Sequence, residues 1–330
     1  MPSKILTISL MLSFGWAAAY AQPQPASPPA TPRPPVAGGA TTSQASTGDL
    51  PSAGTIRTRT DEVNVIFTVT DKHGKFVKDM KQKEFKILDN NLPPKEIKSF
   101  EAETNLPLRV GLLIDASNSI RDRFLFEQQA AIEFLQQTIH PKTDKAFVLA
   151  FDEVWDLEQD FTNDLDKLSR GVKAIRPGGG TAMWDAVYYA CRDKLMRERS
   201  TGIVRLAIVL VSDGDDNQSR VLRQEAIDMA QRAGVIVYAI STNLSNILDT
   251  GDHNLKMLAE ATGGRAFFPF KLQNLADDFH EVQEELRSQY SINYKPDQFS
   301  LNGSYRPIVI LTENKKLKVR AKKGYYVPKE

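Results

Sequence analysis

Apolar runs typical of buried strands alternate with helical segments through the middle of the chain. Residues 108–114, 146–151, 206–211 and 235–241 are nearly continuous apolar runs. Segments with helical character lie near residues 120–139, 164–175, 182–197, 222–233, 255–262 and 274–289. Strands buried on both faces and separated by helices are typical of a parallel sheet covered on both sides. The sequence therefore predicts an α/β domain with a doubly wound, mostly parallel sheet.

Strand patterns of a different kind flank this region. Apolar residues alternate with polar ones over residues 63–70, and short strand candidates follow at 76–77, 85–88 and 97–100. Further candidates lie at 290–294, 306–311, 317–321 and 324–327. A piece of about 50 residues is small for a stable core of its own. We therefore expect residues 55–105 and 289–330 to pair into one β-sandwich, with the α/β domain of residues 106–288 inserted between them.

The first residues have the features of a targeting sequence. Lys4 precedes an apolar run at 5–16, and Ala19-Tyr20-Ala21 fits a small-x-small cleavage pattern. This predicts a signal peptide at residues 1–21; an uncleaved anchor is the alternative, although the run is short for a span of about 20 residues. Residues 22–54 include eight prolines, which predicts a disordered tether. We expect an extracytoplasmic protein, in the periplasm, at the cell surface or secreted.

Charge and cysteine content narrow the function classes. The chain has 42 Lys and Arg residues against 41 Asp and Glu residues, so nucleic-acid binding is not expected. Cys191 is the only cysteine, which argues against a disulfide framework and a Cys-rich zinc site. The four histidines are far apart in the sequence, without the spacing of zinc ligands. Residues 315–323 are strongly basic; we expect the solvated face of an exposed strand there, with an anion-binding surface as the alternative.

Oxygen-bearing side chains gather where predicted strands end. Asp115, Ser117 and Ser119 follow the first apolar strand, Thr181 follows three glycines, and Asp213 closes a later strand. Carboxyl ends of parallel strands share one edge of the sheet, where ligands bind. A shell of carboxylates and hydroxyls selects a hard cation, with Mg²⁺ preferred and Ca²⁺ or Mn²⁺ as alternatives. Taken singly, Ser119 and Thr181 are better explained as helix N-caps and Asp213 as a turn residue, so the prediction of a metal site depends on their combination.

These residues together resemble a known family. The pattern Asp115-x-Ser117-x-Ser119, with Thr181 and Asp213, is similar to the metal ion-dependent adhesion site of von Willebrand factor A domains, over about residues 106–290. The flanking strands, the signal peptide and the Gly-Tyr-Tyr near the end resemble bacterial "VWFA-related" proteins of the Acidobacteria type. The resemblance implies that the five residues hold the metal and that a partner protein adds an Asp or Glu carboxylate.

Neighbouring residues receive simpler interpretations. We expect Asp185 to offset the dipole at a helix start, and Asp215 and Asp216 to be solvated loop acids. Trp184 and Cys191 are expected to pack in the core.

Three classes of function follow from the sequence. The leading hypothesis is a metal-dependent protein-binding module for adhesion or interaction. The alternatives are a structural envelope protein with a stabilising ion and, less favoured, a Mg²⁺-dependent hydrolase. No catalytic residue is assigned, because the site has no neighbouring histidine or lysine and the chain has no nucleophile elbow or phosphate-binding loop. The sequence does not indicate an oligomeric state.

Overall fold

The computed structural model describes residues 62–102, 106–118, 124–198, 204–243, 245, 247–269, 271 and 273–329. The expected signal peptide at 1–21 and tether at 22–54 lie outside these residues. Within the described ranges, no helix is long and apolar enough to cross a membrane.

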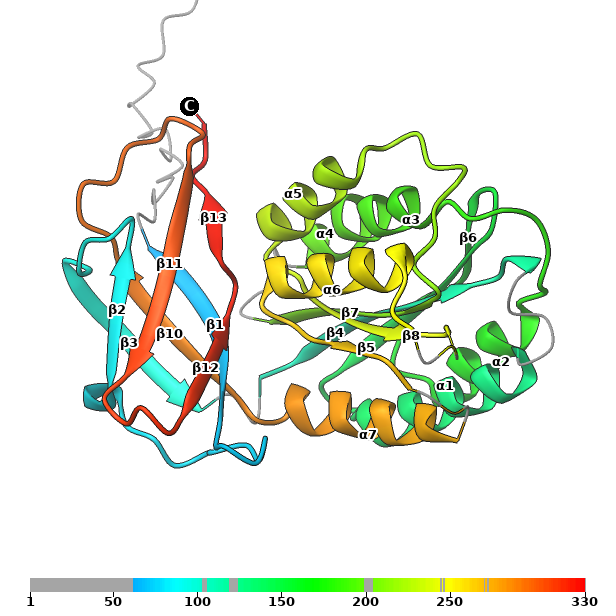
Figure 1. The fold of residues 1–330 in the computed structure, drawn as a ribbon, viewed down its shortest axis with the longest axis horizontal. Helices are drawn as coiled ribbons and strands as arrows, with labels where there is room; N and C mark the ends of the chain where they lie inside the picture. The colour runs from blue at the N-terminus through cyan, green and yellow to red at the C-terminus, as the bar shows by residue number, and fades with distance from the viewer. Residues whose placement is uncertain are drawn as a thin grey trace, which may run out of the picture. The chain divides into compact units, whose positions relative to one another are not determined.

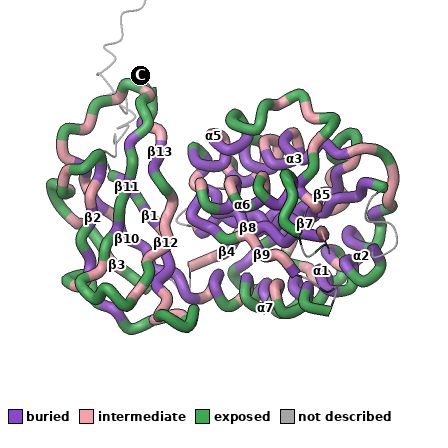
Figure 2. Tube along the Cα trace, viewed as in Figure 1, coloured by how far each residue is buried: buried purple, intermediate pink, exposed green. Residues whose placement is uncertain are grey.

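The central sheet of the α/β domain is mostly parallel, as predicted (Figure 1). Its strand order is β6 (Trp155–Thr162), β5 (Lys145–Phe151), β4 (Leu108–Asp115), β7 (Arg205–Ser212), β8 (Ile236–Ser241) and β9 (Ala266–Phe267). All neighbouring pairs are parallel except β5 and β6. Figure 2 shows β7 and β8 as buried, which fits their apolar runs.

Helices cover both faces of this sheet (Figure 1). One face carries α1 (Phe124–Thr138), α2 (Leu165–Ala174) and α7 (Asn274–Leu286), which share a core with the sheet. The other carries α3 (Met183–Tyr189), a π-helical segment at Ala190–Leu195, α4 (Met196–Glu198), α5 (Arg223–Ala233) and α6 (Thr250–Thr262). The expected doubly wound arrangement is therefore confirmed.

Strands from the two ends of the described chain form two antiparallel sheets. One has the order β12 (Lys318–Ala321), β1 (Val63–Thr70), β10 (Gln289–Lys295) and β3 (Glu96–Ala102). The other has the order β13 (Gly324–Tyr326), β11 (Tyr305–Thr312) and β2 (Phe85–Asp89), with a short 3₁₀ turn at Gln82–Glu84 before β2. The two sheets share one core. The predicted pairing of N- and C-terminal strands is confirmed, while the boundaries at residues 105 and 288 stay predictions.

Aromatic rings occupy the centre of this sandwich. Tyr290 of β10 lies between Phe67 of β1 and Phe100 of β3, with ring centroids 5.5 Å from each. Phe85 of β2 meets Phe67 edge-on at 5.1 Å. Because these rings come from both ends of the chain, the sandwich core cannot form from either end alone.

Some elements differ from the expectation. The sequence analysis missed β6, although Trp155, Leu157 and Phe161 fall on alternate positions. Gln159 interrupts that alternation, and α2 packs closely against β6 at this position. A Cβ on Gly171 of α2 would lie only 2.7 Å from the Gln159 Cβ. Helix α6 begins at Thr250, earlier than residue 255, because the Asp249 side chain caps it.

The basic segment at 315–323 lies partly against the α/β domain. Arg320 of β12 forms an ion pair with Glu285 of α7, and Lys323 pairs with Glu260 of α6 at 3.4 Å. Lys318 is exposed, as expected for an edge strand. Residues 287–330 carry ten basic and three acidic side chains, whereas residues 108–286 have a net charge of −8. These ion pairs thus join the basic end of the chain to the acidic domain.

Candidate metal centre

Asp115 is the last residue of β4 and is fully buried. Its Oδ1 accepts a hydrogen bond of 2.8 Å from the Ser117 backbone N–H, and its Oδ2 accepts one of 2.6 Å from the Ser212 hydroxyl. A carboxylate oxygen has two lone pairs, so these contacts orient the group without exhausting its acceptor capacity. The end of the buried strand thus holds a fixed carboxylate.

The loop after β4 is tied to the glycine loop that leads to α3. Gly178 N–H donates to the Ala116 carbonyl at 2.6 Å, and the Asn118 side chain donates to the Gly179 carbonyl at 3.2 Å. Ser117 is buried in this arrangement. Asn118 therefore fastens one loop to the other. Ser119 lies outside the described residues.

Thr181 is held by the loop that follows β7. Its backbone N–H donates to Asn217 Oδ1 at 3.0 Å, and its carbonyl accepts from the Asn217 and Gln218 N–H groups, both at 3.0 Å. A Cβ on Gly180 would lie 2.8 Å from Asn217 Oδ1, so the close approach requires glycine. These contacts place Thr181, which is buried, beside the loop that carries Asp213.

Asp213 follows β7 directly and is partly exposed. Its Oδ1 accepts a hydrogen bond of 3.2 Å from the Asp215 N–H. The next residue, Gly214, has a φ of +83°, and a Cβ there would lie 2.1 Å from the Gly251 carbonyl oxygen. The turn that positions Asp213 therefore needs glycine at 214.

The site carries two neighbouring carboxylates. Burial raises the pKa of Asp115 to about 6, and the negative charge of Asp213 adds to that effect, while hydrogen bonds from Ser212 and Ser117 oppose it. No basic side chain is among the groups that shift this pKa. A buried carboxylate near a second one is stabilised by a cation between them. This charge arrangement fits a bound cation.

The donor set indicates which cation fits. Among the described residues, no group of three His, Cys, Asp or Glu side chains could hold a metal, so the carboxylates would have to share the ion with hydroxyl groups. Ser117 and Thr181, whose backbones are held by the contacts described above, carry such hydroxyls. An all-oxygen set of this kind suits Mg²⁺, Ca²⁺ or Mn²⁺ better than a softer metal. The residues present fit a hard divalent cation.

Nearby acidic residues have structural partners. Asp185 Oδ1 accepts hydrogen bonds from the Arg220 and Val221 N–H groups, and Asp216 Oδ2 accepts from the Trp184 N–H at 3.1 Å. Asp216 therefore supports the start of α3, which differs from the expected solvated loop acid. Asp215 is exposed, as expected. Trp184 and Cys191 are buried in the core, which confirms their packing role.

Two residues of the site were not found from the sequence. Ser212 is buried, bonds Asp115 and accepts a hydrogen bond from Gly214 N–H at 3.0 Å. The feature that could have indicated Ser212 is its position, since it is a hydroxyl residue at the end of an apolar strand, directly before Asp213. Asn217 fixes Thr181 across 36 positions of sequence. Nothing in the spacing of Asn217 indicated that contact.

Comparisons with known proteins returned solved structures and one family model. Proximal thread matrix protein 1 from the mussel byssus, in a structure described as having a zinc-occupied MIDAS motif, is 15% identical; the match covers 61% of this chain and 50% of that chain, with a TM-score of 0.49. A von Willebrand factor type A structure from Catenulispora acidiphila is 14% identical. The match covers 74% of this chain and 72% of that chain, with a TM-score of 0.49. The chain spans about half the length of the mussel protein.

A third solved structure is the vWF domain of the pilus tip protein Mfa5 from Porphyromonas gingivalis. It is 14% identical, the match covers 55% of this chain and 95% of that chain, and the TM-score is 0.46. The sequence has no match among curated proteins. The family model for the von Willebrand factor type A domain matches residues 110–285, which is more than half of the 330 residues. This chain therefore belongs to the von Willebrand factor type A domain family.

Proposed function

We propose that this protein is an extracytoplasmic interaction module that docks an acidic residue of a partner protein through a bound divalent cation. Asp115, Ser117, Ser119, Thr181 and Asp213 would hold the ion, with Mg²⁺ as the preferred metal. The targeting pattern at residues 1–21 supports the location outside the cytoplasm. In this proposal the protein is a binding module for adhesion or interaction and has no catalytic residues.

One observation carries the proposal. Three loops that are distant in sequence are fastened together around Asp115, by the bonds Gly178–Ala116, Thr181–Asn217 and Ser212–Asp115. They bring two carboxylates and two described hydroxyl side chains to one edge of the sheet. Mg²⁺ takes six ligands, so the carboxylates and hydroxyls of this site would leave coordination positions that an incoming carboxylate could fill.

The surroundings of the site favour a partner with apolar side chains near its acid. Large apolar side chains that follow the carboxyl ends of the strands in sequence are exposed: Leu125 (81%) in the first turn of α1, and Val154 (68%), Leu222 (68%) and Ile247 (77%) between elements. Apolar side chains that are exposed near a binding site are available to contact a partner protein. The proposed partner therefore offers an Asp or Glu flanked by apolar residues.

A displayed peptide library tests the docking role. Peptides with one Asp or Glu among apolar residues are selected on the immobilised protein in Mg²⁺ and then measured by surface plasmon resonance. We expect binding that EDTA abolishes, that Asp115→Ala abolishes, and that is lost when the peptide acid is changed to Asn or Gln. Asp166→Ala is the matched control, because this exposed acid lies on α2 outside the site.

The same experiment separates the alternatives. Metal-dependent stability without any acid-dependent binding would favour an ion with a purely structural role. Equal peptide binding by Asp115→Ala and wild type would contradict the docking role outright. Mg²⁺-dependent turnover by the purified protein, lost in Asp115→Ala, would favour the hydrolase.

A further inference from the structure

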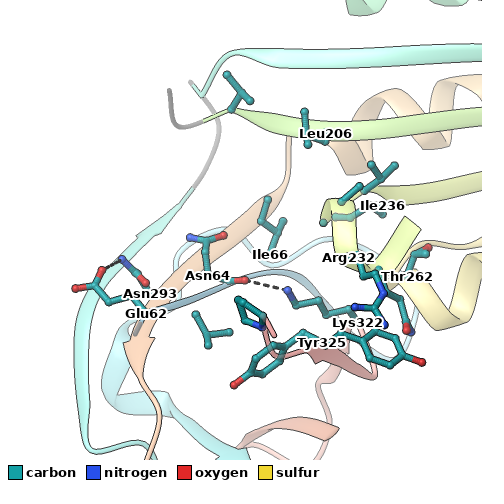
Figure 3. A pocket seen from close by; sticks show the side chains of 18 of the residues that line it. Glu62, Asn64, Ile66, Leu206, Arg232, Ile236, Thr262, Asn293, Lys322 and Tyr325 are labelled. Carbon is teal, nitrogen blue, oxygen red and sulfur yellow. Dashed lines mark hydrogen bonds between the residues drawn. The ribbon is translucent and has the colours of Figure 1, made fainter. Parts of the chain in front are cut away.

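A cavity of about 650 Å³ lies between the sandwich and the amino-terminal edge of the central sheet (Figure 3). Leu206 and Ile236, near the first residues of β7 and β8, line it, and so do residues of β1, α5 and β13. Asp115 and Asp213 lie at the opposite, carboxyl ends of the strands. The size falls in the range of about 300–1,000 Å³ that small-molecule sites occupy. This cavity is therefore distinct from the candidate metal centre.

Specific contacts join the sandwich to α6 and α7 on one side of the cavity. The Arg320–Glu285 and Lys323–Glu260 ion pairs join the two parts of the chain, and Gln289 Nε2 donates to the Tyr238 hydroxyl at 2.9 Å. At Gly263 the backbones come so close that a Cβ would lie 2.4 Å from the Lys322 nitrogen. The cavity is thus framed by specific contacts on the side of α6 and α7, as expected of a preformed site.

Apolar residues form just over half of the wall. The side chains come from the sandwich and from the central sheet, and they are Val63, Ile66, Val204, Leu206, Val235, Ile236, Phe299 and Leu301. Figure 3 shows Ile66, Leu206 and Ile236 on the upper side of the cavity. A ligand body that lies against this wall would be a hydrocarbon or an aromatic ring.

Cationic side chains lie at one side of the cavity. Lys322 Nζ donates to the Asn64 carbonyl at 3.1 Å, and Figure 3 shows Arg232 next to Lys322. The Arg232 guanidinium lies 4.0 Å from the centre of the Tyr326 ring, which fixes its plane. In the part of the chain that the structure describes, no carboxylate forms an ion pair with Arg232. A planar guanidinium held in this way suits a carboxylate, which it binds through two N–H groups.

The acidic lining residue is on another side. Glu62 accepts a hydrogen bond of 2.9 Å from the Asn293 side chain, and Figure 3 shows this pair away from Arg232. The cavity thus combines an apolar wall with a cationic end. We propose that it binds an amphipathic organic carboxylate, whose headgroup pairs with Arg232 and Lys322 and whose apolar body lies against Ile66, Leu206 and Ile236.

Isothermal titration calorimetry of the full chain with octanoate and with 3-phenylpropionate tests this inference, and octanol is the uncharged comparison. We expect at least one acid to bind. Octanol should bind at least about tenfold more weakly than octanoate, because its hydroxyl cannot form the charge-assisted contact that a carboxylate makes. A tighter fit of one acid would identify the body as aliphatic or aromatic. No binding of either acid, or equal binding of octanol and octanoate, would overturn the proposal.

Two variants locate the binding in the cavity. Arg232→Gln should weaken the better acid about tenfold or more, whereas Arg223→Gln, on the same helix but outside the cavity, should leave it unchanged. Ile66→Trp should block binding by filling the cavity, with circular dichroism as the check on folding. An Arg232→Gln variant that binds as well as wild type would contradict the assigned headgroup position. EDTA should have no effect, which separates this site from the metal centre.

Discussion

Ser212 is the residue that most directly supports the Asp115 carboxylate. It is buried, donates to Asp115 Oδ2 at 2.6 Å and accepts from the Gly214 N–H at 3.0 Å. Ser212→Ala removes the hydroxyl that bonds both the Asp115 carboxylate and the Gly214 N–H. We therefore expect the free energy of unfolding to fall by about 1–3 kcal/mol. Urea unfolding in EDTA measures this loss in the absence of metal. Ser300→Ala, at an exposed position, is the control, and equal stability of the two variants would contradict the role of Ser212.

Asp278 on α7 makes stability depend on pH. Burial raises its pKa to about 7, and the negative charge of Glu281 contributes in the same direction. Between about pH 4 and 7 the folded protein keeps this proton while the unfolded chain releases it, so stability falls as the pH rises. We expect Asp278→Asn to raise Tm by a few degrees at pH 8 and to have little effect at pH 4.

Thermal unfolding followed by circular dichroism at several pH values checks this expectation. The control is Asp166→Asn, which removes the same charge from an exposed position on α2. A Tm difference between Asp278→Asn and wild type that is the same at pH 4 and pH 8 would contradict the assignment.

At the residue scale, the sequence indicates functional side chains when they occur in a recurrent motif. Asp115, Thr181 and Asp213 were predicted as site residues because each follows a predicted strand or a glycine loop. Ser212 and Asn217 were missed because their roles depend on hydrogen bonds between segments, and such bonds leave no spacing signal. The same holds for Asp216, whose partner, the Trp184 N–H, lies 32 positions away.

At the scale of elements, β12 and α7 are joined by a buried charge pair. Glu285 is 1% exposed and pairs with Arg320, and burial raises the pKa of the Glu285 carboxyl above its usual range while Arg320 opposes that shift. Arg320→Met leaves a buried carboxylate without its counter-ion. We expect a loss of about 3–5 kcal/mol in the free energy of unfolding at pH 8, measured by urea titration.

The double variant Arg320→Met/Glu285→Met is expected to recover most of that stability, since no buried charge remains. Lys323→Met is the matched control on the same segment. It breaks a more exposed pair with Glu260, and such pairs contribute about 0–1 kcal/mol. If Arg320→Met cost no more than Lys323→Met, the buried pair would not join the two elements as described.

Elements were predictable where one pattern dominated. The apolar strands β4, β5, β7 and β8 lie close to their expected positions because burial on both faces requires continuous apolar residues. Strand β6 was missed because Gln159 interrupts its alternation. Strand β9 has two residues, which is too short for any periodic signal.

At the scale of the molecule, the α/β domain is inserted in a sandwich whose sheets need both ends of the chain. Strand β1 pairs with β10 and β12, and β2 pairs with β11. Tyr290 is at the centre of this assembly, where its hydroxyl donates to the Val77 carbonyl at 2.8 Å. Tyr290→Ala should cost about 3–5 kcal/mol, as for other large buried aromatic residues.

Urea unfolding monitored by far-UV circular dichroism measures that loss. Tyr305→Ala is the control, because Tyr305 is 40% exposed at the first residue of β11 in the same sandwich. A similar cost for both substitutions would contradict the view that the ring cluster from both ends of the chain stabilises the sandwich.

The most direct test of the central claim is thermal unfolding of the chain in Mg²⁺ and in EDTA, for wild type and for Ser117→Ala/Thr181→Ala. An ion at 100 times its dissociation constant adds about 2.7 kcal/mol if it binds only the folded protein. We predict a higher Tm in Mg²⁺ for wild type and no Mg²⁺ effect in the variant. An equal Mg²⁺-dependent rise in both proteins, or no rise in wild type at millimolar Mg²⁺, would contradict a metal centre built on these residues.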